Sequence, residues 1–466
     1  ETVSTDFDLA DRLYFEPITF EDIMNIIEFE KPDGVLVQFG GQTPLKIAEQ
    51  LTNEGVKIFG TSSASIDLAE NREEFARIVK KLKIQIPEYC IAKNYDEIIN
   101  FSEVAKFPVL VRPSYVLGGR AMQIVYNKEQ LVDYVFRSAE ATNDHPILID
   151  QFIENAFEFD VDALCDGEEV FMAGIMQHIE EAGVHSGDSS CVLPPYDMSA
   201  KIKKDIIEMT TKLALELKVV GLINLQFAVK GDKAYVLEVN PRSSRTVPFV
   251  SKYSNVPLAN IAAQLSVGKK LKDFNLKENN LKHIAVKKAV LPFKKFKDEK
   301  VFLGPEMKST GEVMGIDNES GIAFLKAMQS DGYTVPNEGT AFISISDIDK
   351  KRALPIIKDL LLLNFNIIAT KGTAKFLIEN GIDCTSVFKV GEGRPNVVDE
   401  ILNDNIQLVI NTPIGEKSRY DEEAIGKTSV MKNVLTITTL SGAKAAIAAM
   451  SNLDQVRVKP LQEYFK

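Results

Sequence analysis

The first 62 residues combine helical and extended hydrophobic patterns. Apolar positions recur at helical spacing in FEDIMNIIEFEK (20–31) and in PLKIAEQLTNEG (44–55). Two short apolar runs, GVLVQFGG (34–41) and VKIFGT (56–61), predict buried strands. Two strands and two helices cannot cover both faces of a parallel sheet, so we expect a truncated Rossmann-like unit whose other strands lie upstream of Glu1.

Residues 63–330 predict a second unit, of the α+β class, with mostly antiparallel sheets. It opens on a helical region with Ser and Asp start signals, TSSASIDLAENREEFARIVKKLKI. A long helix (199–219), a hairpin (221–242) and a helix (257–271) follow a series of strands. The predicted strands of that series are 108–114, 121–127, 146–153, 157–167 and 169–180.

From residue 331 to 466 the alternation of strands and helices becomes regular. This pattern predicts a small doubly wound α/β domain. The predicted strands are 340–347, 365–370, 384–389, 406–412 and 434–440, and the helices are 350–364, 373–381, 397–405 and 442–451.

Bulk composition narrows the class of protein. The chain has 466 residues, of which 45% are hydrophobic and 26% charged, as in soluble multidomain proteins. The net charge of −12 argues against nucleic acid or an anionic membrane as the main partner. The longest apolar stretch, 353–370, is interrupted by Lys358, Asp359 and Asn364, so we expect no membrane span and a cytoplasmic protein.

The cysteines and histidines give no metal or disulfide signature. The four cysteines are widely separated and form no CxxC pair, which favours free thiols in a reducing compartment. The four histidines also lack metal-ligand spacing.

The hairpin at 221–242 carries the first candidate site. Glu238 and Asn240 lie two residues apart on one strand and therefore on one face. Folding about the turn Lys230–Lys233 brings Gln226 opposite them, and these oxygen ligands suit Mg²⁺. Arg242 and Arg245, just after the strand, suit a phosphoryl group. The alternative is an edge strand with a salt-bridged exit loop.

A second candidate is the stretch PVLVRPSYVLGGRA. Arg112 ends an apolar strand, and Ser114 and the pair Gly118–Gly119 follow it. Glycine amides can approach a phosphate closely, although a plain turn explains the pair equally well. The stretch is neither a P-loop nor a dinucleotide-binding fingerprint.

Longer motifs resemble a known family. RPSYVLGGRAMQIVY, EEAGVHSGDSSCVLP, NLQFAVK and LEVNPRSSRTVPFVSK, in this order, look like the ATP-grasp fold. Together with ETVSTDFDLADRLYFEP, GVLVQFGGQTPLKIAEQL and LGPEMKSTGEVMG, they resemble the C-terminal half of the carbamoyl phosphate synthetase large-subunit family. The resemblance implies a partial pre-ATP-grasp domain (1–62), an ATP-grasp synthetic domain (63–330) and a methylglyoxal-synthase-like allosteric domain (331–466).

By motif, the resemblance also implies roles for individual residues. Arg242 and Arg245 would face the phosphoryl group in transfer, and Gln226, Glu238 and Asn240 would bind two Mg²⁺ or Mn²⁺ ions, with K⁺ a further candidate. Gln226 and Glu238 would also contact ATP. The other implied ATP contacts are Arg72, Arg112, Gln151, Ile153, Glu158, Gly183, Val184, His185 and Ser186.

The implied reaction is ATP-dependent phosphorylation of carbamate to carbamoyl phosphate, within a glutamine-hydrolysing synthase of pyrimidine and arginine biosynthesis. It requires alignment and charge neutralisation rather than covalent help. Because carbamate is already an anion, we expect a binding or structural role for His185 rather than a general-base role. Implied partners are a glutaminase small subunit and the N-terminal half of the large subunit. A homo-oligomer is also compatible with the sequence.

The last domain contains a candidate effector pocket. ATKGTA places Thr370, Gly372 and Thr373 at a helix N-terminus, which favours an anion. Further polar residues follow other strands of the same sheet, where ligands of such sheets bind. These residues are Lys350, Lys389, Asn411 and Thr412, joined by motif by Ser344. The resemblance implies a nucleotide or phosphoribosyl effector.

Two positions depart from the family pattern. Lys288 stands where some relatives hold an ornithine amine with an acid, so we predict no ornithine activation. Pro413 replaces a hydroxyl residue of the effector pocket, which leaves the effector's identity open. Two other functions also remain open: a different ATP-grasp carboxylate–amine ligase, and a non-catalytic effector-binding fragment.

Overall fold

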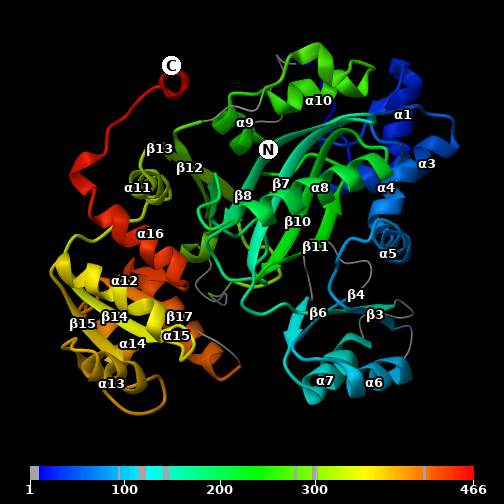
Figure 1. The fold of residues 1–466 in the computed structure, drawn as a ribbon. Coiled ribbons are helices and arrows are strands. Elements are labelled where there is room, and N and C mark those ends of the chain that lie inside the picture. The colour runs from blue at the N-terminus through cyan, green and yellow to red at the C-terminus, as the bar shows by residue number, and fades with distance from the viewer. Residues whose placement is uncertain are drawn as a thin grey trace.

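The computed structural model describes residues 10–92, 95–113, 122–139, 146–277, 281–295, 301, 303–412 and 416–466. Ser114, Gly118, Gly119 and Pro413 lie outside the described residues. Figure 1 shows the C-terminal domain, in yellow to red, beside a large central sheet.

The N-terminal unit is a two-stranded parallel sheet with helices around it. Strand β1 is shorter than predicted because the chain turns at residues 38–41, where Gly41 has a φ of +70°. The elements of this unit are α1 (Phe20–Glu30), β1 (Val35–Leu36), α2 (Gln42–Lys46), α3 (Ala48–Asn53) and β2 (Ile58–Phe59). The predicted α/β character of this region is confirmed.

Next in the chain is a four-stranded antiparallel sheet of order β3-β6-β4-β5. Helices α6 and α7 pack together beside it, and β3 was not predicted from the sequence. The elements are α4 (Ser63–Glu70), α5 (Arg72–Lys81), β3 (Tyr89–Ala92), α6 (Tyr95–Val104), β4 (Val109–Pro113), β5 (Gln123–Val125), α7 (Lys128–Ala139) and β6 (Ile147–Gln151).

The central sheet has seven antiparallel strands in the order β11-β10-β7-β8-β9-β12-β13, which confirms the predicted α+β class. Strands β9, β12 and β13 and helix α11 were not predicted. The strands are β7 (Phe157–Asp166), β8 (Val170–His178), β9 (Cys191–Leu193), β10 (Val220–Lys230), β11 (Lys233–Asn240), β12 (Ile284–Val290) and β13 (Gly311–Asp317). The helices are α8 (Ala200–Glu216), α9 (Val247–Ser254), α10 (Leu258–Ser266) and α11 (Ser320–Ser330), with 3₁₀ turns η2 (Leu271–Phe274) and η3 (Pro292–Lys294).

Helix α8 illustrates why these elements form where they do. The hydroxyl of Ser199 accepts a hydrogen bond of 3.2 Å from the amide of Ile202 and so caps the helix. Ile202, Ile206 and Leu213 recur at helical spacing and are buried in the core under the sheet.

The C-terminal domain is a five-stranded parallel sheet of order β16-β15-β14-β17-β18, which confirms the predicted doubly wound architecture. Helix α15 was not predicted. The strands are β14 (Gly339–Ile345), β15 (Phe365–Thr370), β16 (Thr385–Val387), β17 (Leu408–Thr412) and β18 (Leu435–Ile437). The helices are α12 (Lys350–Leu362), α13 (Lys371–Glu379), α14 (Val397–Leu402), α15 (Glu416–Lys432) and α16 (Leu440–Met450), with η4 (Leu453–Gln455) and η5 (Leu461–Phe465).

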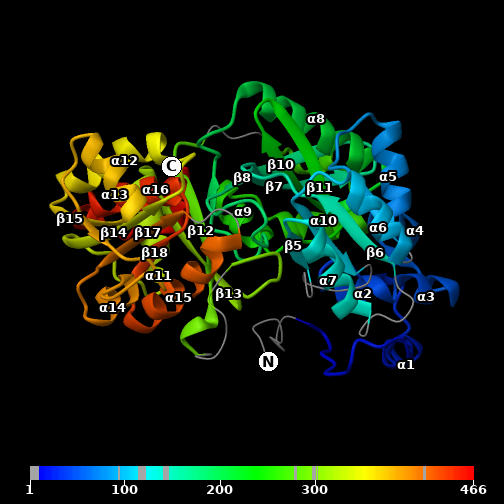
Figure 2. The same cartoon turned by 90° about the horizontal axis from the view of Figure 1, so that it is seen from below.

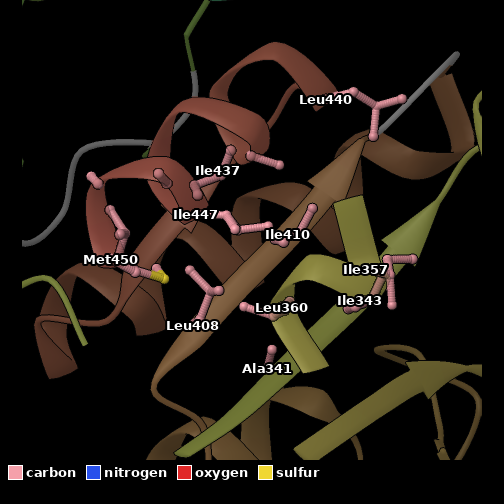
Figure 3. Close-up of a cluster of buried hydrophobic side chains, with 14 of the residues drawn as sticks. Ala341, Ile343, Ile357, Leu360, Leu408, Ile410, Ile437, Leu440, Ile447 and Met450 are labelled. Carbon is pink, nitrogen blue, oxygen red and sulfur yellow. The ribbon is translucent and has the colours of Figure 1, made fainter. Parts of the chain in front are cut away.

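The core of this domain continues into the central sheet. Figure 3 shows Ile343, Ile410 and Ile447 within the buried cluster between the parallel sheet and its helices. The same cluster contains Ile179 and Val286 of the preceding domain, and α11 contacts both β13 and α16. In Figure 2, turned by 90°, the C-terminal domain lies at one side of the molecule and the N-terminal helices at the other. The boundaries at 62/63 and 330/331 stay predictions.

Among the described residues, none of the helices is both long enough and apolar enough to cross a lipid bilayer.

Candidate active site and effector pocket

The β10–β11 hairpin brings the predicted metal ligands together. The strands are joined by Gly231 and Asp232, and their register places Gln226 opposite Glu238 and Asn224 opposite Asn240. Gln226 therefore lies across from Glu238, as expected from the sequence. Glu238 is exposed, and within the described part of the chain its carboxylate forms no hydrogen bond or ion pair. It is available to bind a cation.

The two amides are oriented by neighbouring residues. The Gln226 Nε2 donates a hydrogen bond of 2.9 Å to the Ser186 hydroxyl, which leaves Oε1 as a free acceptor. The Asn240 Oδ1 accepts from the Arg242 Nη2 at 3.1 Å and keeps a second lone pair. One carboxylate and two amide oxygens fit a hard divalent cation that takes its remaining ligands from phosphate and water. The metal-binding roles stay predictions.

Arg242 and Arg245 lie beside this set. The Arg242 guanidinium donates from Nε to Gln42 Oε1 at 3.3 Å and from Nη1 to the Ser243 carbonyl at 2.9 Å. Burial lowers the pKa of Arg242, and the negative charge of Glu238 works against that shift. Burial raises the pKa of the Glu312 carboxyl, and the nearby positive charge of Arg245 opposes that rise. Both arginines thus lie among acidic groups at one end of the hairpin.

Residues 183–186 form one wall of the same region. The Gly183 amide donates to Glu158 Oε1 at 3.0 Å, and the Val184 amide to the Glu181 carbonyl at 3.3 Å. Ser186 contacts one of the predicted metal ligands, because its hydroxyl accepts a hydrogen bond from Gln226. Both oxygens of Glu158 have protein partners, because Oε2 lies 3.3 Å from His178 Nδ1, and the predicted contact of Glu158 with ATP stays a prediction.

His185 is held as a neutral ring. Its Nδ1 accepts a hydrogen bond of 3.0 Å from the Gly187 amide, and its own amide donates to the Gly304 carbonyl at 2.8 Å. Burial lowers the pKa of His185, with Asp188 and Glu238 opposing the shift. The acceptor role of Nδ1 places the ring proton on Nε2, which is then a hydrogen-bond donor. This geometry supports the binding role expected for His185.

Sequence reasoning missed a buried charged cluster beneath this wall. His178 is sandwiched between Glu158 and Asp160, with Nε2 3.2 Å from Asp160 Oδ2. Burial works to lower the pKa of His178, but Cys191 and Asp160 outweigh it, so the pKa lies well above its usual value. Asp160, His178 and Cys191 place ligand atoms within 4.8 Å of one another, as a metal site would. The two carboxylates favour an imidazolium instead.

Lys287, on β12, joins this cluster to the wall formed by residues 183–186. Its ammonium donates to the Ser186 carbonyl at 3.2 Å and lies 3.7 Å from Glu312 Oε1. Burial opposes its charge, but Cys191, Glu312 and Asp160 outweigh it and raise the pKa of Lys287. Acidic residues in the otherwise apolar run FEFDVDALCDG were the only signal of this cluster in the sequence.

Arg72 and Arg112 converge on one buried acid. Arg72 Nη2 bonds to Asp150 Oδ1, and Arg112 Nη2 lies 3.7 Å from Asp150 Oδ2. Gln151, the next residue, ends β6, and Ile153 lies just beyond it; both side chains are half-buried. These four residues lie on or beside the four-stranded sheet, whereas the hairpin belongs to the seven-stranded sheet.

The effector residues converge at the carboxyl ends of the parallel strands. A cavity of about 390 Å³ is lined by Ser344, Thr370, Lys389, Asn411 and Thr412. Thr370 and Thr373 are buried, and their hydroxyls bond to each other at 3.2 Å at the start of α13. Asp421, which was not predicted, also lines the cavity, and burial raises its pKa against the opposing charge of Lys389.

Two predicted effector residues lie beside the cavity rather than in its lining. Lys350 bonds to Asp347 Oδ1 at 2.6 Å and to the Gly372 carbonyl at 3.1 Å, so its ammonium already has protein partners. Thr373 accepts from the Ile345 amide at 3.1 Å. The effector roles of both stay predictions.

Three domain families match consecutive parts of the chain. They are the carbamoyl phosphate synthase preATP-grasp domain over residues 1–68, the carbamoyl-phosphate synthase L chain ATP binding domain over 71–274, and the MGS-like domain over 352–438. The "Carbamoyl phosphate synthase large chain, C-terminal section" of Aquifex aeolicus is 49% identical over 474 residues, covering 98% of this chain and 88% of that protein. The chain belongs to the carbamoyl phosphate synthase large-chain family.

Other members of the large-chain family are longer. The "Carbamoyl phosphate synthase large chain" of Archaeoglobus fulgidus is 54% identical over 468 residues, covering 100% of this chain and 44% of that protein. The chain thus spans less than half the length of that relative. Matches of this extent confirm the predicted family and its ATP-grasp and MGS-like domains.

Solved structures agree on the fold. The biotin carboxylase domain of Hydrogenobacter thermophilus 2-oxoglutarate carboxylase, a complex with MgADP, ADP and bicarbonate, gives a TM-score of 0.58 at 15% identity, covering 70% of this chain and 81% of that chain. The biotin carboxylase of Campylobacter jejuni, described as a β-γ-ATP complex, gives a TM-score of 0.54 at 13% identity, covering 66% of this chain and 78% of that chain. At these identities the likeness shows the fold alone.

Proposed function

We propose that this chain is the carbamate-phosphorylating half of a carbamoyl phosphate synthase. An oxygen of carbamate attacks the γ-phosphorus of ATP, the bond from that phosphorus to the β-phosphate oxygen breaks, and carbamoyl phosphate and ADP result. The observation that carries the proposal is the pairing of Gln226 and Glu238 across the hairpin, with Arg242 and Arg245 at its end.

The residues present fit one or two divalent cations. Gln226, Glu238 and Asn240 would hold Mg²⁺ or Mn²⁺, and the bound metal would neutralise charge on the phosphate oxygens. K⁺ is a further candidate ion, for which we name no binding residues. Arg242 and Arg245 would bind the transferring phosphoryl group, and neutral His185 would donate from Nε2.

The positively charged end of the buried cluster supports an anionic second substrate. The ammonium of Lys287 donates to the Ser186 carbonyl, and the Ser186 hydroxyl accepts from Gln226. A small carboxylate such as carbamate, placed between Lys287 and Arg245, would be aligned with the phosphoryl group and screened from water.

Partners follow from the family rather than from the site. We propose that the N-terminal half of a large chain and a glutaminase small subunit supply the carbamate, so glutamine hydrolysis belongs to that small subunit. We also propose a nucleotide or phosphoribosyl effector in the cavity of about 390 Å³, because its hydroxyls, Lys389 and helix N-terminus suit a phosphate.

The reverse reaction tests the catalytic proposal on this chain alone. Incubation with ADP, Mg²⁺ and carbamoyl phosphate is expected to form ATP, with carbamate released in equal amount. Absence of ATP, together with a thermal shift from UMP, IMP or phosphoribosyl pyrophosphate, would instead support a non-catalytic effector-binding fragment. ATP hydrolysis that requires a different carboxylate and an amine would support another ATP-grasp ligase.

A further inference from the structure

The N-terminal unit is bonded to both strands of the metal hairpin. The Thr61 hydroxyl accepts from the Val220 amide at 3.0 Å, at the start of β10. The buried Gln38 side chain donates from Nε2 to the Pro241 carbonyl at 2.8 Å, just after β11. The main-chain carbonyl of Gln38 also accepts a hydrogen bond of 2.9 Å from the Ser243 amide. The main chain on each side of Arg242 is therefore fixed by one residue of the N-terminal unit.

The slot that holds Gln38 is shaped by two glycines. Gly60 has a φ of +90°, and a Cβ built there would lie 2.3 Å from Gln38 Oε1. A Cβ at Gly221 would lie 3.2 Å from the same oxygen. A side chain at Gly60 would therefore displace the Gln38 amide, and one at Gly221 would crowd it.

Gln42, four residues after Gln38, reaches the arginine itself. Its Oε1 accepts the hydrogen bond from Arg242 Nε at 3.3 Å, while Nη1 and Nη2 donate to Ser243 and Asn240. A guanidinium has five N–H groups in one plane, so three fixed bonds determine its orientation and leave two N–H groups for a ligand. Of the three acceptors, Asn240 and Ser243 lie within two residues of Arg242, and Gln42 comes from the N-terminal unit.

We propose that Gln42 is a positioning residue for phosphoryl transfer, orienting Arg242 from the N-terminal unit while Gln38 anchors the surrounding main chain. The inference rests on the proposed role of Arg242 at the phosphoryl group. A guanidinium freed at Nε rotates about its side-chain bonds, and small misplacements of a transition-state contact reduce rate strongly while leaving nucleotide binding intact.

Kinetics of ATP formation from ADP and carbamoyl phosphate test the role. Gln42→Ala is expected to lower kcat about 10-fold to 100-fold with KM for ADP within about twofold of the parent. Gln42→Glu keeps an acceptor oxygen for Nε and is expected to restore kcat to within about threefold of the parent. Gln50→Ala changes an exposed glutamine of the same unit and is the matched control. Unchanged kcat in Gln42→Ala, or a Gln42→Glu variant as slow as Gln42→Ala, would overturn the proposal.

A crystal structure of the Gln42→Ala chain gives a readout that does not depend on turnover. The Arg242 guanidinium is expected to leave Asn240 Oδ1, whereas an unmoved guanidinium would contradict the positioning role. If the parent chain forms no ATP, the proposed function fails by itself, and the crystal structure still decides whether Gln42 orients Arg242.

Discussion

The Thr439 hydroxyl donates a hydrogen bond of 2.8 Å to the main-chain carbonyl of Ile179, 260 residues earlier in the chain. The same hydroxyl caps α16 by accepting from the Gly442 amide at 2.9 Å. Ile179 directly follows His178, the imidazole between Glu158 and Asp160. One buried threonine therefore joins the C-terminal domain to the end of β8, the strand that carries His178.

Replacing this threonine tests the strength of the junction. Thr439→Val keeps the shape but leaves the Ile179 carbonyl and the Gly442 amide without their partner, so the free energy of unfolding should fall by about 1–3 kcal/mol. Thr439→Ser keeps both bonds and should lose less than about 1 kcal/mol. Urea unfolding of the three proteins measures the difference. Equal stability of the Val and Ser variants would show that the hydrogen bond contributes nothing.

Glu238→Gln tests the metal assignment. An exposed carboxylate without a protein partner contributes little to folding, so the unfolding midpoint should stay within about 1 °C. ATP formation should fall at least about 100-fold, because an amide replaces the one negative ligand of the set. Glu208→Gln, on the exposed face of α8, is the control and should keep parental activity. Near-parental activity of Glu238→Gln would refute the metal role.

Asp162 should make stability depend on pH. It is fully buried, accepts from Thr246 at 2.5 Å, Ser244 at 2.8 Å and Asn224 at 3.0 Å, and burial raises its pKa to about 6. A raised folded-state pKa means that the folded protein binds the proton more tightly than the unfolded chain. The contribution of Asp162 to stability is therefore present below pH of about 4 and is lost as pH rises to about 6.

The matched comparison is with Asp162→Asn, which does not titrate. The difference in free energy of unfolding, parent minus variant, should fall by about 2–3 kcal/mol between pH 4 and 6 and stay level above. Urea unfolding at several pH values measures it. A difference that is constant or rises over this window would contradict the raised pKa of Asp162.

Lys288 should prevent activation by ornithine. Its ammonium lies 3.3 Å from Asp331 Oδ2 and 5.0 Å from the centre of the Tyr333 ring, in the lining of a cavity of about 810 Å³. At the position of Lys288 itself, a second ammonium would meet a positive charge where some relatives offer an acid. Millimolar ornithine should change neither the rate of ATP formation nor the thermal midpoint, while a nucleotide or phosphoribosyl effector shifts the latter. A rate increase with ornithine would overturn this prediction.

Local chemistry made the hairpin predictable. A two-residue turn at Gly231–Asp232 sets a register that would pair Gln226 with Leu237, and the irregularity between Gln226 and Phe227 shifts the pairing so that Gln226 lies opposite Glu238. Strand β12 was missed because Lys287 and Lys288 interrupt its apolar pattern, although Lys287 is fully buried by partners from other strands. Helix α15 was missed because EKSRYDEEAIGKTSVMK lacks an apolar stripe.

The buried charged cluster could not be predicted from the sequence, because its residues come from different strands. Asp160, His178 and Lys287 come from strands β7, β8 and β12, and only the order of the sheet brings them together. The spacing of these residues along the chain does not predict that they lie close together. The same holds for Gln42 and Arg242, which lie 200 residues apart.

The continuous core between the central and C-terminal domains bears on any attempt to separate them. Ile179, Val192 and Val286 are buried in one cluster with Ile437 and Ala443. A chain cut after residue 330 would present these side chains and one face of α11 to water, which favours aggregation of the truncated product. The C-terminal domain therefore cannot be removed without exposing a buried core, so its role is best studied by single substitutions in the intact chain.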